Sequence, residues 1–349
     1  IVPVVFASDD KYVPMLTTTI LSMLENASKD RFYDIVVLEH DISEANKKAM
    51  RTFFSCFANV RIRYCDVAPY VSGHSLVTNN EHISAETYYR FLVQEILPFY
   101  DKVLYLDSDL LVLGDVAELF DTDLEDKLLA AAYDIDFAGN VNMNDGKRLA
   151  YTKDVLKLDD PYDYFQAGVL VLNTTEMRSL HTADEWMRLA SDSEYIYDDQ
   201  DVLNAECEGR VVYLDWSWNV MHDCMGRVGS VFSFAPAEEL QAYMESREHP
   251  RIVHFAGAEK PWTNARCDYA GLYWEYARRV PFYEQFLIQQ MTVAEEHAVF
   301  VDPMHPSAVA QDSRLRRVID PIAPLGSARR EVAKSVARVF MRPKNEDGD

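Results

Sequence analysis

Short apolar runs alternate with segments of helical periodicity along residues 2–214. The apolar runs are rich in Val, Ile, Leu and Tyr, which predicts strands at residues 2–7, 34–39, 60–67, 102–106, 128–133, 168–172 and 211–214. Apolar residues spaced three and four apart predict helices at residues 14–24, 43–57, 85–97 and 199–207. This alternation predicts a Rossmann-like α/β fold with a mainly parallel sheet, which binds ligands at the carboxyl ends of its strands.

The pattern changes towards the C-terminus. A further strand is predicted at residues 252–255 and a pair of aromatic-rich helices at residues 269–291. Beyond residue 301 prolines interrupt the chain, and helical spacing resumes only at residues 329–341. We therefore expect one main α/β domain at residues 1–290 and a helical C-terminal appendage at residues 291–349.

The charge of the chain limits the kinds of partner that it can bind. Its 57 Asp and Glu against 34 Lys and Arg give a net charge of -23, which argues against nucleic acid. An acidic protein that binds an anion needs local positive charge, and a divalent cation can supply it. No apolar run is long enough to span a membrane, and the first one lacks the length and basic flank of a secretory signal. We therefore expect a cytoplasmic protein, whose five cysteines have no metal-binding spacing and are reduced thiols.

The strongest local signal is the pair Asp107 and Asp109, which directly follows the predicted strand at residues 102–106. The strand delivers both carboxylates to the carboxyl edge of the sheet, with the small Ser108 between them. Such hard oxygen ligands suit Mg²⁺ or Mn²⁺, which can bridge carboxylates and a diphosphate. An EF-hand is excluded, because Leu111 and Val112 occupy positions that need a ligand and the turn glycine. The pair predicts a divalent-metal site, although Asp-x-Asp also occurs in solvated turns.

A second polar group follows the predicted strand at residues 252–255. His254 lies in that strand, Gly257 provides a turn, and Lys260 comes three residues later. A neutral imidazole is a suitable third ligand for Mn²⁺, and a lysine ammonium is a point charge for a phosphate. A histidine at a strand end is more often hydrogen-bonded to the backbone, and the residues alone favour that interpretation.

Six segments in order resemble glycosyltransferase family 8. Its members are retaining enzymes of the GT-A fold and include bacterial lipopolysaccharide galactosyl- and glucosyltransferases and glycogenin. The segments are residues 6–12 (FASDDKY), 84–90 (SAETYYR), 106–109 (LDSD), 165–173 (FQAGVLVLN), 199–204 (DQDVLN) and 254–262 (HFAGAEKPW). The resemblance covers about residues 1–290. It implies a metal-dependent hexosyltransferase that moves glucose or galactose from a UDP-sugar to a glycan, glycolipid or glycoprotein acceptor.

The resemblance also implies roles for the matching residues. It makes Asp107, Asp109 and His254 the ligands of Mn²⁺ or Mg²⁺. Asp199 and Gln200 become the catalytic residues at the donor sugar, with Gln200 near the reactive face of the anomeric carbon. The implied donor-binding residues are Ala7, Asp9, Tyr12, Arg90, Asp107, Ser108, Asp109, Gln166, Ala167, Gly257 and Lys260.

At the nucleotide end, Tyr12 is expected to stack on the uracil and Asp9 to accept from its ring N–H. Two residues depart from the family pattern. Lys11 stands where asparagine is common before the tyrosine, which puts one nucleotide contact in doubt. Gln166 stands where asparagine is common before Ala-Gly, and this leaves the identity of the donor hexose open.

Retention allows two routes, double displacement or front-face attack. Gln200 is a poor nucleophile and Asp199 a usable one, and we favour front-face attack. Two other interpretations of the chain are a catalytically inactive protein that binds carbohydrate or nucleotide sugar, and a nucleotidyltransferase. The first predicts decay of the metal ligands, which are intact. The second predicts a glycine-rich basic loop after the first strand, where this chain has SDDK at residues 8–11.

Two further groups of residues have more than one interpretation. Asp134 and Asp136 follow a predicted strand and either face the acceptor or belong to a solvated turn. Trp216, Trp218 and Asn219 either form a pocket wall or belong to the core, which is commoner for clustered aromatic residues.

The C-terminal segment differs in charge from the rest of the chain. Residues 313–344 hold nine Lys and Arg against two acidic residues, a charge of +7, which leaves about -30 elsewhere (-23 minus 7). The predicted helix at residues 329–341 is basic and amphipathic, which suits peripheral contact with the inner face of a membrane. Docking on the acidic body is a nearly equal alternative. The sequence does not indicate an oligomeric state.

Overall fold

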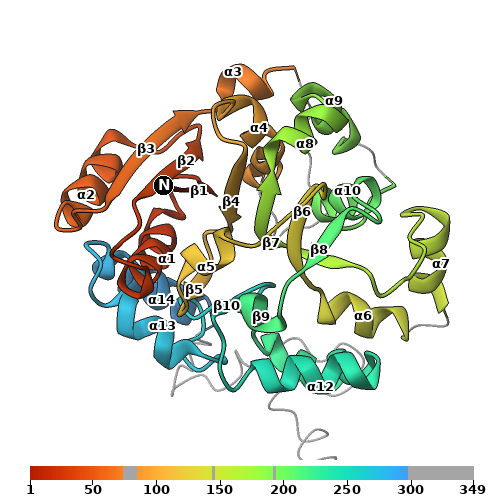
Figure 1. Ribbon diagram of the computed structural model, residues 1–349. Helices are drawn as coiled ribbons and strands as arrows, with labels where there is room; N and C mark the ends of the chain where they lie inside the picture. The colour runs from red at the N-terminus through yellow and green to blue at the C-terminus, as the bar shows by residue number, and fades with distance from the viewer. Residues whose placement is uncertain (74–84, 144–145, 192–193, 298–349) are drawn as a thin grey trace, which may run out of the picture. The chain divides into compact units, whose positions relative to one another are not determined.

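The computed structural model describes residues 1–73, 85–143, 146–191 and 194–297. Within the chain, Ile1–Gln290 forms one compact unit. Its centre is a sheet with the strand order β3-β2-β1-β4-β7-β6-β8 (Figure 1). These strands are β1 (Val2–Ala7), β2 (Tyr33–Glu39), β3 (Val60–Asp66), β4 (Lys102–Leu106), β6 (Leu129–Tyr133), β7 (Phe165–Asn173) and β8 (Val211–Tyr213).

The sheet is mixed but mainly parallel, as predicted. The strand β7 is antiparallel to both of its neighbours, β4 and β6, and the other four pairings are parallel. The antiparallel strand brings residues 165–168, at the beginning of β7, beside the carboxyl end of β4. Segments far apart in the chain therefore meet at one edge of the sheet.

Both faces of the sheet are covered, because successive side chains of a strand point to opposite faces. In β1, Val4 and Phe6 belong to one apolar core, and Val5 and Ala7 belong to the other. The first core is covered by α1 (Val13–Asn26), α2 (Glu44–Phe54), α5 (Val116–Phe120), α13 (Ala270–Ala277) and the first turn of α14 (Tyr283–His297). The second is covered by α3 (Ala68–Val71), η1 (Ala85–Leu92), α4 (Val93–Ile96), α8 (Thr174–Leu180), α9 (Ala183–Leu189) and α10 (Asp198–Glu206).

Smaller elements surround two minor cores. They are α6 (Ile135–Val141), α7 (Lys147–Asp154), η3 (Trp216–Asn219), η4 (Cys224–Gly226), α11 (Arg227–Ser230), η5 (Phe232–Phe234) and α12 (Ala237–Ser246). Several of these helices are too short to show periodicity in the sequence, and the sequence analysis did not predict them.

A small second sheet joins segments that are distant in the sequence. It has the order β5-β10-β9, with β5 (Leu110–Val112), β10 (Ile252–His254) and β9 (Val220–Met221). Only β10 was predicted. Because β5 begins directly after Asp109, residues 107–109 form the turn between the two sheets. His254 is the register partner of Leu110, so the small sheet carries the histidine to that turn.

The single helix predicted at residues 85–97 is wrong in form, because the segment is a 3₁₀ helix, η1, followed by α4. Three residues per turn bring Thr87 and Arg90 onto one face, where Arg90 Nη2 donates to Thr87 Oγ1 (3.1 Å). The helix predicted at residues 329–341 and the basic segment at residues 313–344 lie outside the described residues. Among the described helices, none has both the length and the apolar character needed to cross a membrane.

Candidate active site

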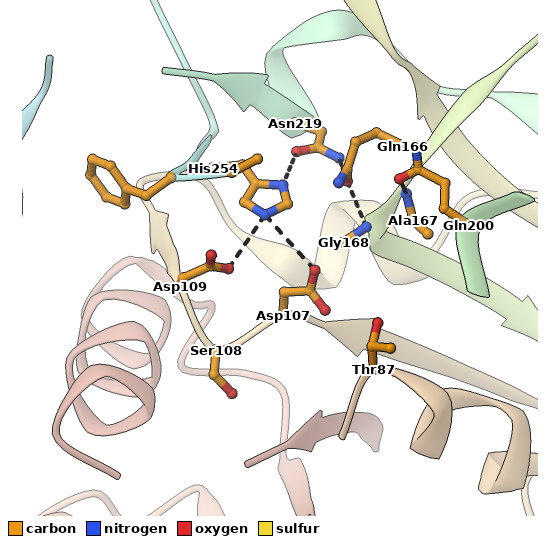
Figure 2. A network of polar contacts seen from close by, with 12 residues as sticks. Thr87, Asp107, Ser108, Asp109, Gln166, Ala167, Gly168, Gln200, Asn219 and His254 are labelled. Carbon is orange, nitrogen blue, oxygen red and sulfur yellow. Dashed lines mark hydrogen bonds and ion pairs between the residues drawn. The ribbon is translucent and has the colours of Figure 1, made fainter. Parts of the chain in front are cut away.

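Three potential metal ligands meet at the turn between the two sheets. His254 Nε2 lies 3.3 Å from Asp109 Oδ1 and 3.8 Å from Asp107 Oδ2 (Figure 2). Two backbone bonds hold the turn: Asp107 N donates to Gly168 O (2.8 Å), and Phe255 N donates to Asp109 O (3.1 Å). The donor set of two carboxylates and one imidazole suits a divalent cation such as Mn²⁺.

Hydrogen bonds behind His254 orient its ring. Nδ1 lies 3.0 Å from Asn219 Oδ1, and Asn219 Nδ2 in turn donates to Gln166 Oε1 (2.7 Å). With its amide nitrogen committed to Gln166, Asn219 presents an acceptor to His254. The ring therefore carries its proton on Nδ1 and turns the lone pair of Nε2 towards the two carboxylates. Gln166 Oε1 also accepts from Gly168 N (2.6 Å). Gln166 therefore fixes Asn219 and, through it, the ring of His254, a function that was not expected from its implied role in donor binding.

Gly168 leaves room for an ion at this site. A Cβ at this position would lie 2.4 Å from His254 Cε1 and 2.6 Å from Asp107 Oδ2. No side chain fits there without displacing a ligand. The space, the lone pair of Nε2 and the two carboxylates together fit a bound divalent cation.

Asn219→Ala is expected to weaken Mn²⁺ binding roughly 10–100-fold, the usual cost of removing a partner that orients a metal ligand. The reason is that the His254 ring loses the acceptor that selects its tautomer. Isothermal titration with Mn²⁺ measures the effect. The matched control is Asn142→Ala, at an exposed position outside the cavity lining. Equal Mn²⁺ affinities in the two variants would contradict the orienting role of Asn219.

Lys260 pairs with the metal site. Its Nζ donates to Asp109 Oδ2 (2.5 Å) and to Phe255 O (2.5 Å). Burial by itself would lower the pKa of Lys260, but the Asp109 carboxylate outweighs it and holds that pKa above its ordinary value. Burial would likewise raise the pKa of Asp109, but the Lys260 ammonium holds it well below the usual range. Both groups are therefore charged at neutral pH.

Arg227 is a second cation on the same side of the cavity as Lys260, and it was not predicted from the sequence. Its Nη2 donates to Ala256 O (2.6 Å), and its Nη1 lies 3.5 Å from Asp136 Oδ2. Gly257 has φ +103°, and a Cβ there would lie 3.2 Å from Arg227 Nη2 and 3.0 Å from Cys224 Sγ. Glycine thus permits both the turn and the close approach of the arginine. No motif surrounds Arg227 in the sequence, so only the fold reveals it.

Arg90 connects the metal site with Asp199. Its Nη2 donates to Asp107 Oδ1 (3.0 Å), and its Nε lies 2.9 Å from Asp199 Oδ2. A further bond from Nη1 reaches Ala167 O. Thr87 Oγ1 donates to Asp199 Oδ1 (2.5 Å), so both oxygens of that carboxylate are engaged. The guanidinium is 4% exposed and holds two carboxylates in a fixed geometry.

Gln200 is held at both ends of its amide. Oε1 accepts from Ala167 N (3.0 Å), and Nε2 donates to Asp134 Oδ2 (2.9 Å). Asp134 also caps α6 by accepting from Phe137 N (2.9 Å). Burial and then the charge of Asp136 raise the pKa of Asp134 to about 6. Asp134 is 6% exposed, so the solvated-turn interpretation is wrong for it.

Asp199→Asn is expected to change the pH dependence of stability. Burial, only partly offset by Arg90, raises the pKa of Asp199 to about 6. The unfolded chain has the ordinary pKa near 3.8, so between about pH 3.8 and pH 6 the native state binds more protons than the unfolded state. The contribution of Asp199 to the free energy of unfolding is therefore fully present below this pH window and is lost as the pH rises through it. Because asparagine does not titrate, the free energy of unfolding of the variant should rise by about 3 kcal/mol relative to that of the parent protein as the pH increases across this window.

Urea unfolding at several pH values measures this difference. Asp101→Asn, whose side chain is 92% exposed, is the matched control and should run parallel to the parent protein. A constant difference between Asp199→Asn and the parent across the window would contradict the raised pKa.

The nucleotide-side residues predicted from the sequence lie at the first strand. Asp9 Oδ1 accepts from Tyr12 N (2.8 Å), which closes the turn after β1. The Tyr12 ring packs edge-on against Trp262, with 5.9 Å between ring centroids. Ser108 Oγ donates to Ala7 O (2.7 Å), so the metal turn and this loop are joined directly.

All of the predicted site residues line one cavity of about 520 Å³. They are Ala7, Asp9, Tyr12, Arg90, Asp107, Ser108, Asp109, Gln166, Ala167, Asp199, Gln200, His254, Gly257 and Lys260. The cavity also receives Thr87, Asp134, Asp136, Phe137, Tyr197 and Arg227. Trp218, 6% exposed, belongs to the core instead, and Asn219 acts from behind His254.

Comparison with known proteins agrees with this geometry. A family model for glycosyl transferase family 8 matches residues 3–266. The chain belongs to glycosyltransferase family 8. The resemblance predicted from the six segments is therefore confirmed, and the chain is a glycosyltransferase.

Several proteins of known sequence or structure are similar to the chain over most of its length. General stress protein A of Bacillus subtilis (strain 168) is 27% identical over 283 residues, which are 79% of this chain and 93% of that protein. The structure of the bifunctional glycosyltransferase WbbM is 32% identical with a TM-score of 0.74, covering 83% of this chain and 52% of WbbM. The galactosyltransferase LgtC, crystallised with donor and acceptor sugar analogs, is 27% identical with a TM-score of 0.61, covering 88% and 99%. The chain therefore has the GT-A fold and spans about half of WbbM.

Proposed function

We propose that this family 8 enzyme transfers glucose or galactose from a UDP-sugar to a glycan, glycolipid or glycoprotein acceptor, with retention and with the help of Mn²⁺ or Mg²⁺. The observation that carries the proposal is the cluster of Asp107, Asp109 and His254 on the wall of the cavity. Lys260 and Arg227 line the same cavity, so an acidic protein concentrates positive charge where a diphosphate would bind.

The nucleotide end of the cavity is proposed to bind uridine. Tyr12 offers a ring face to a base, with Trp262 supporting the ring from its edge. Asp9 is partly buried, and its carboxylate could accept from an imide N–H. The metal turn is tied to this loop through Ser108, so a base and a diphosphate could be held at a fixed separation.

In the proposed reaction, the bond between the anomeric carbon and the diphosphate oxygen breaks and negative charge grows on the diphosphate. Bound Mn²⁺ or Mg²⁺ would supply Lewis-acid stabilisation of that charge. Lys260 and Arg227 would add two cations that are already oriented, which requires no reorganisation during the reaction. The acceptor hydroxyl oxygen forms the new bond to the anomeric carbon, and its proton passes to the leaving diphosphate oxygen.

The contacts of Asp199 and Gln200 support front-face attack over double displacement. Both oxygens of Asp199 accept from Thr87 or Arg90, so attack on carbon would require breaking a charge-assisted bond in a buried site. Gln200 is held by Ala167 and Asp134, which favours a role in positioning the sugar. Trapping a covalent sugar adduct on Asp199 would contradict this route.

Asp134 and Asp136 are proposed to face the acceptor. They line the cavity, where Asp134 accepts from Gln200 and Asp136 pairs with Arg227. Carboxylates are suited to accept hydrogen bonds from sugar hydroxyls.

Peripheral attachment to a membrane remains a proposal that rests on the basic residues 313–344, and liposome co-sedimentation with and without residues 313–349 tests it. Equal sedimentation of the two forms would contradict it.

A donor screen tests the proposed function. The purified full chain is incubated with each UDP-hexose, and UDP release is followed with Mn²⁺ and with EDTA. We expect release from UDP-glucose or UDP-galactose with Mn²⁺ and none above background with EDTA. Anomer-specific NMR of the product reports retention. Failure of every UDP-hexose to support metal-dependent release would favour an inactive nucleotide-sugar-binding protein instead.

A further inference from the structure

A second group of metal-ligating side chains lies beside the first and has no part in the proposed transfer. It comprises His222, Cys224 and Glu259, which each contribute one ligand atom to a cluster spanning no more than 4.8 Å. His222 follows β9, Glu259 lies in the loop after β10, and these strands are parallel neighbours. Two loops from adjacent strand ends thus bring nitrogen, sulfur and oxygen ligands together.

His222 has a buried ring nitrogen without a partner. Its backbone N–H donates to His254 O (3.0 Å), and its ring Nδ1 lies 3.3 Å from the same oxygen. Because a carbonyl oxygen only accepts, Nδ1 carries the ring proton and Nε2 carries the lone pair. Nε2 is buried and has no hydrogen-bond partner among the described residues, and the whole side chain is 0% exposed. A buried acceptor left without a partner destabilises the fold, and a bond to a metal ion would offset this loss.

A third segment packs against the first of these loops. Asp223 N, between the two ligands of that loop, donates to Asp268 Oδ2 (2.9 Å), which brings residues 267–268 against it. The Cys267 thiol of this segment is free and 8% exposed, but its sulfur lies outside the cluster of ligand atoms.

We propose that His222, Cys224 and Glu259 bind one Zn²⁺, separate from the ion of the catalytic site. One imidazole, one carboxylate and one cysteine thiolate match the nitrogen, oxygen and sulfur ligands that Zn²⁺ takes, and water completes the tetrahedron in sites with three protein ligands. Bond lengths of about 2.0–2.3 Å put ligand atoms roughly 3.5 Å apart, which small side-chain shifts reach from the observed cluster. Glu259 is held in place, since its Oε2 accepts from Met225 N (2.9 Å).

The proposed ion has a structural consequence for the active site. It joins the loop after β9 to residues 255–267, the segment that carries Gly257 and Lys260. Cys224 Sγ lies 3.0 Å from the position of a Cβ on Gly257, so a ligand of the proposed Zn²⁺ packs directly against this glycine turn. Fixing both loops would keep Lys260 at Asp109 in the absence of donor.

Cobalt substitution tests the proposal on the purified full chain. Metal is removed with a chelator and Co²⁺ is added, because thiolate ligands give Co²⁺ an intense near-ultraviolet charge-transfer band that oxygen and nitrogen ligands do not. We expect this band in the parent chain and in Asp107→Asn, which alters only the catalytic ligands. Absence of the band in the parent chain overturns the proposal without reference to any variant, and it leaves the donor screen unaffected.

Zinc analysis of variants gives a second measurement. Chain purified without added metal should retain about one Zn²⁺ after dialysis, and Cys224→Ser or His222→Gln should retain about a tenth of that amount. The matched control is Cys56→Ser, at an exposed position, which should retain the parent amount. A Zn²⁺ content unchanged in Cys224→Ser overturns the site.

Discussion

Asp109→Asn is expected to lower UDP release from the preferred UDP-hexose roughly 10³-fold at saturating Mn²⁺, because several kcal/mol of charge stabilisation at the diphosphate depend on the bound ion. Asparagine keeps the shape of the side chain but removes the charge that faces His254 at 3.3 Å and Lys260 at 2.5 Å. The variant therefore binds Mn²⁺ weakly and leaves Lys260 without its carboxylate. Steady-state kinetics over a range of Mn²⁺ concentrations measure both effects.

The matched control for this experiment is Asp101→Asn. This aspartate directly precedes β4, whereas Asp109 follows its carboxyl end, and the Asp101 side chain is 92% exposed. Its loss should leave UDP release within twofold of the parent, about the scatter expected for a surface change. If Asp109→Asn kept the parent rate and the parent Mn²⁺ dependence, the metal-dependent mechanism would be wrong. Circular dichroism of both variants separates lost chemistry from lost folding.

Arg90→Met is expected to lower the free energy of unfolding by about 3–5 kcal/mol, the usual cost of removing one partner of a buried ion pair. The guanidinium serves Asp107, Asp199 and the Ala167 carbonyl at once, and Asp199 is 3% exposed. Methionine fills much of the volume, so the loss measures the uncompensated charge of Asp199. Because the pKa of Asp199 is already raised to about 6, the deficit should shrink as the pH falls below that value.

Arg188→Met is the control for Arg90→Met. The Arg188–Asp184 pair has a separation of 3.0 Å, but both side chains are 65% exposed, so its loss should cost less than about 1 kcal/mol. Arg90→Lys should recover only part of the stability, since one ammonium cannot reproduce the planar fork that bridges two carboxylates. Urea unfolding of the three variants gives the comparison. Equal losses in Arg90→Met and Arg188→Met would contradict a structural role for the buried pair.

Local sequence patterns predicted the larger elements because their causes are local. The strand at residues 102–106 appears in the structure as β4 with the same bounds, and the helix at residues 14–24 appears as α1 with small shifts at its ends. The helix at residues 85–97 was wrong because its winding depends on contacts of Thr87 and Arg90 with Asp199, which is distant in the chain. The strands β5 and β9 were missed because so few residues show no alternation; pairing with β10 defines them.

The amino-acid sequence was sufficient to predict the α/β class, the family and those cavity residues that belong to the six segments. These follow from apolar periodicity and from motifs whose residues are contiguous. Which atoms face one another became known only from the folded structure. It showed that Asn219 and Gln166 orient His254, that Asp199 is held by Arg90, and that Arg227 lines the cavity. It also brought His222, Cys224 and Glu259 together. Hydrogen bonds, burial and ligand spacing depend on distances in space, and strand pairing sets these distances between segments that are far apart in the chain. Here β10 pairs with β5, more than a hundred residues away, and with β9, about thirty residues away.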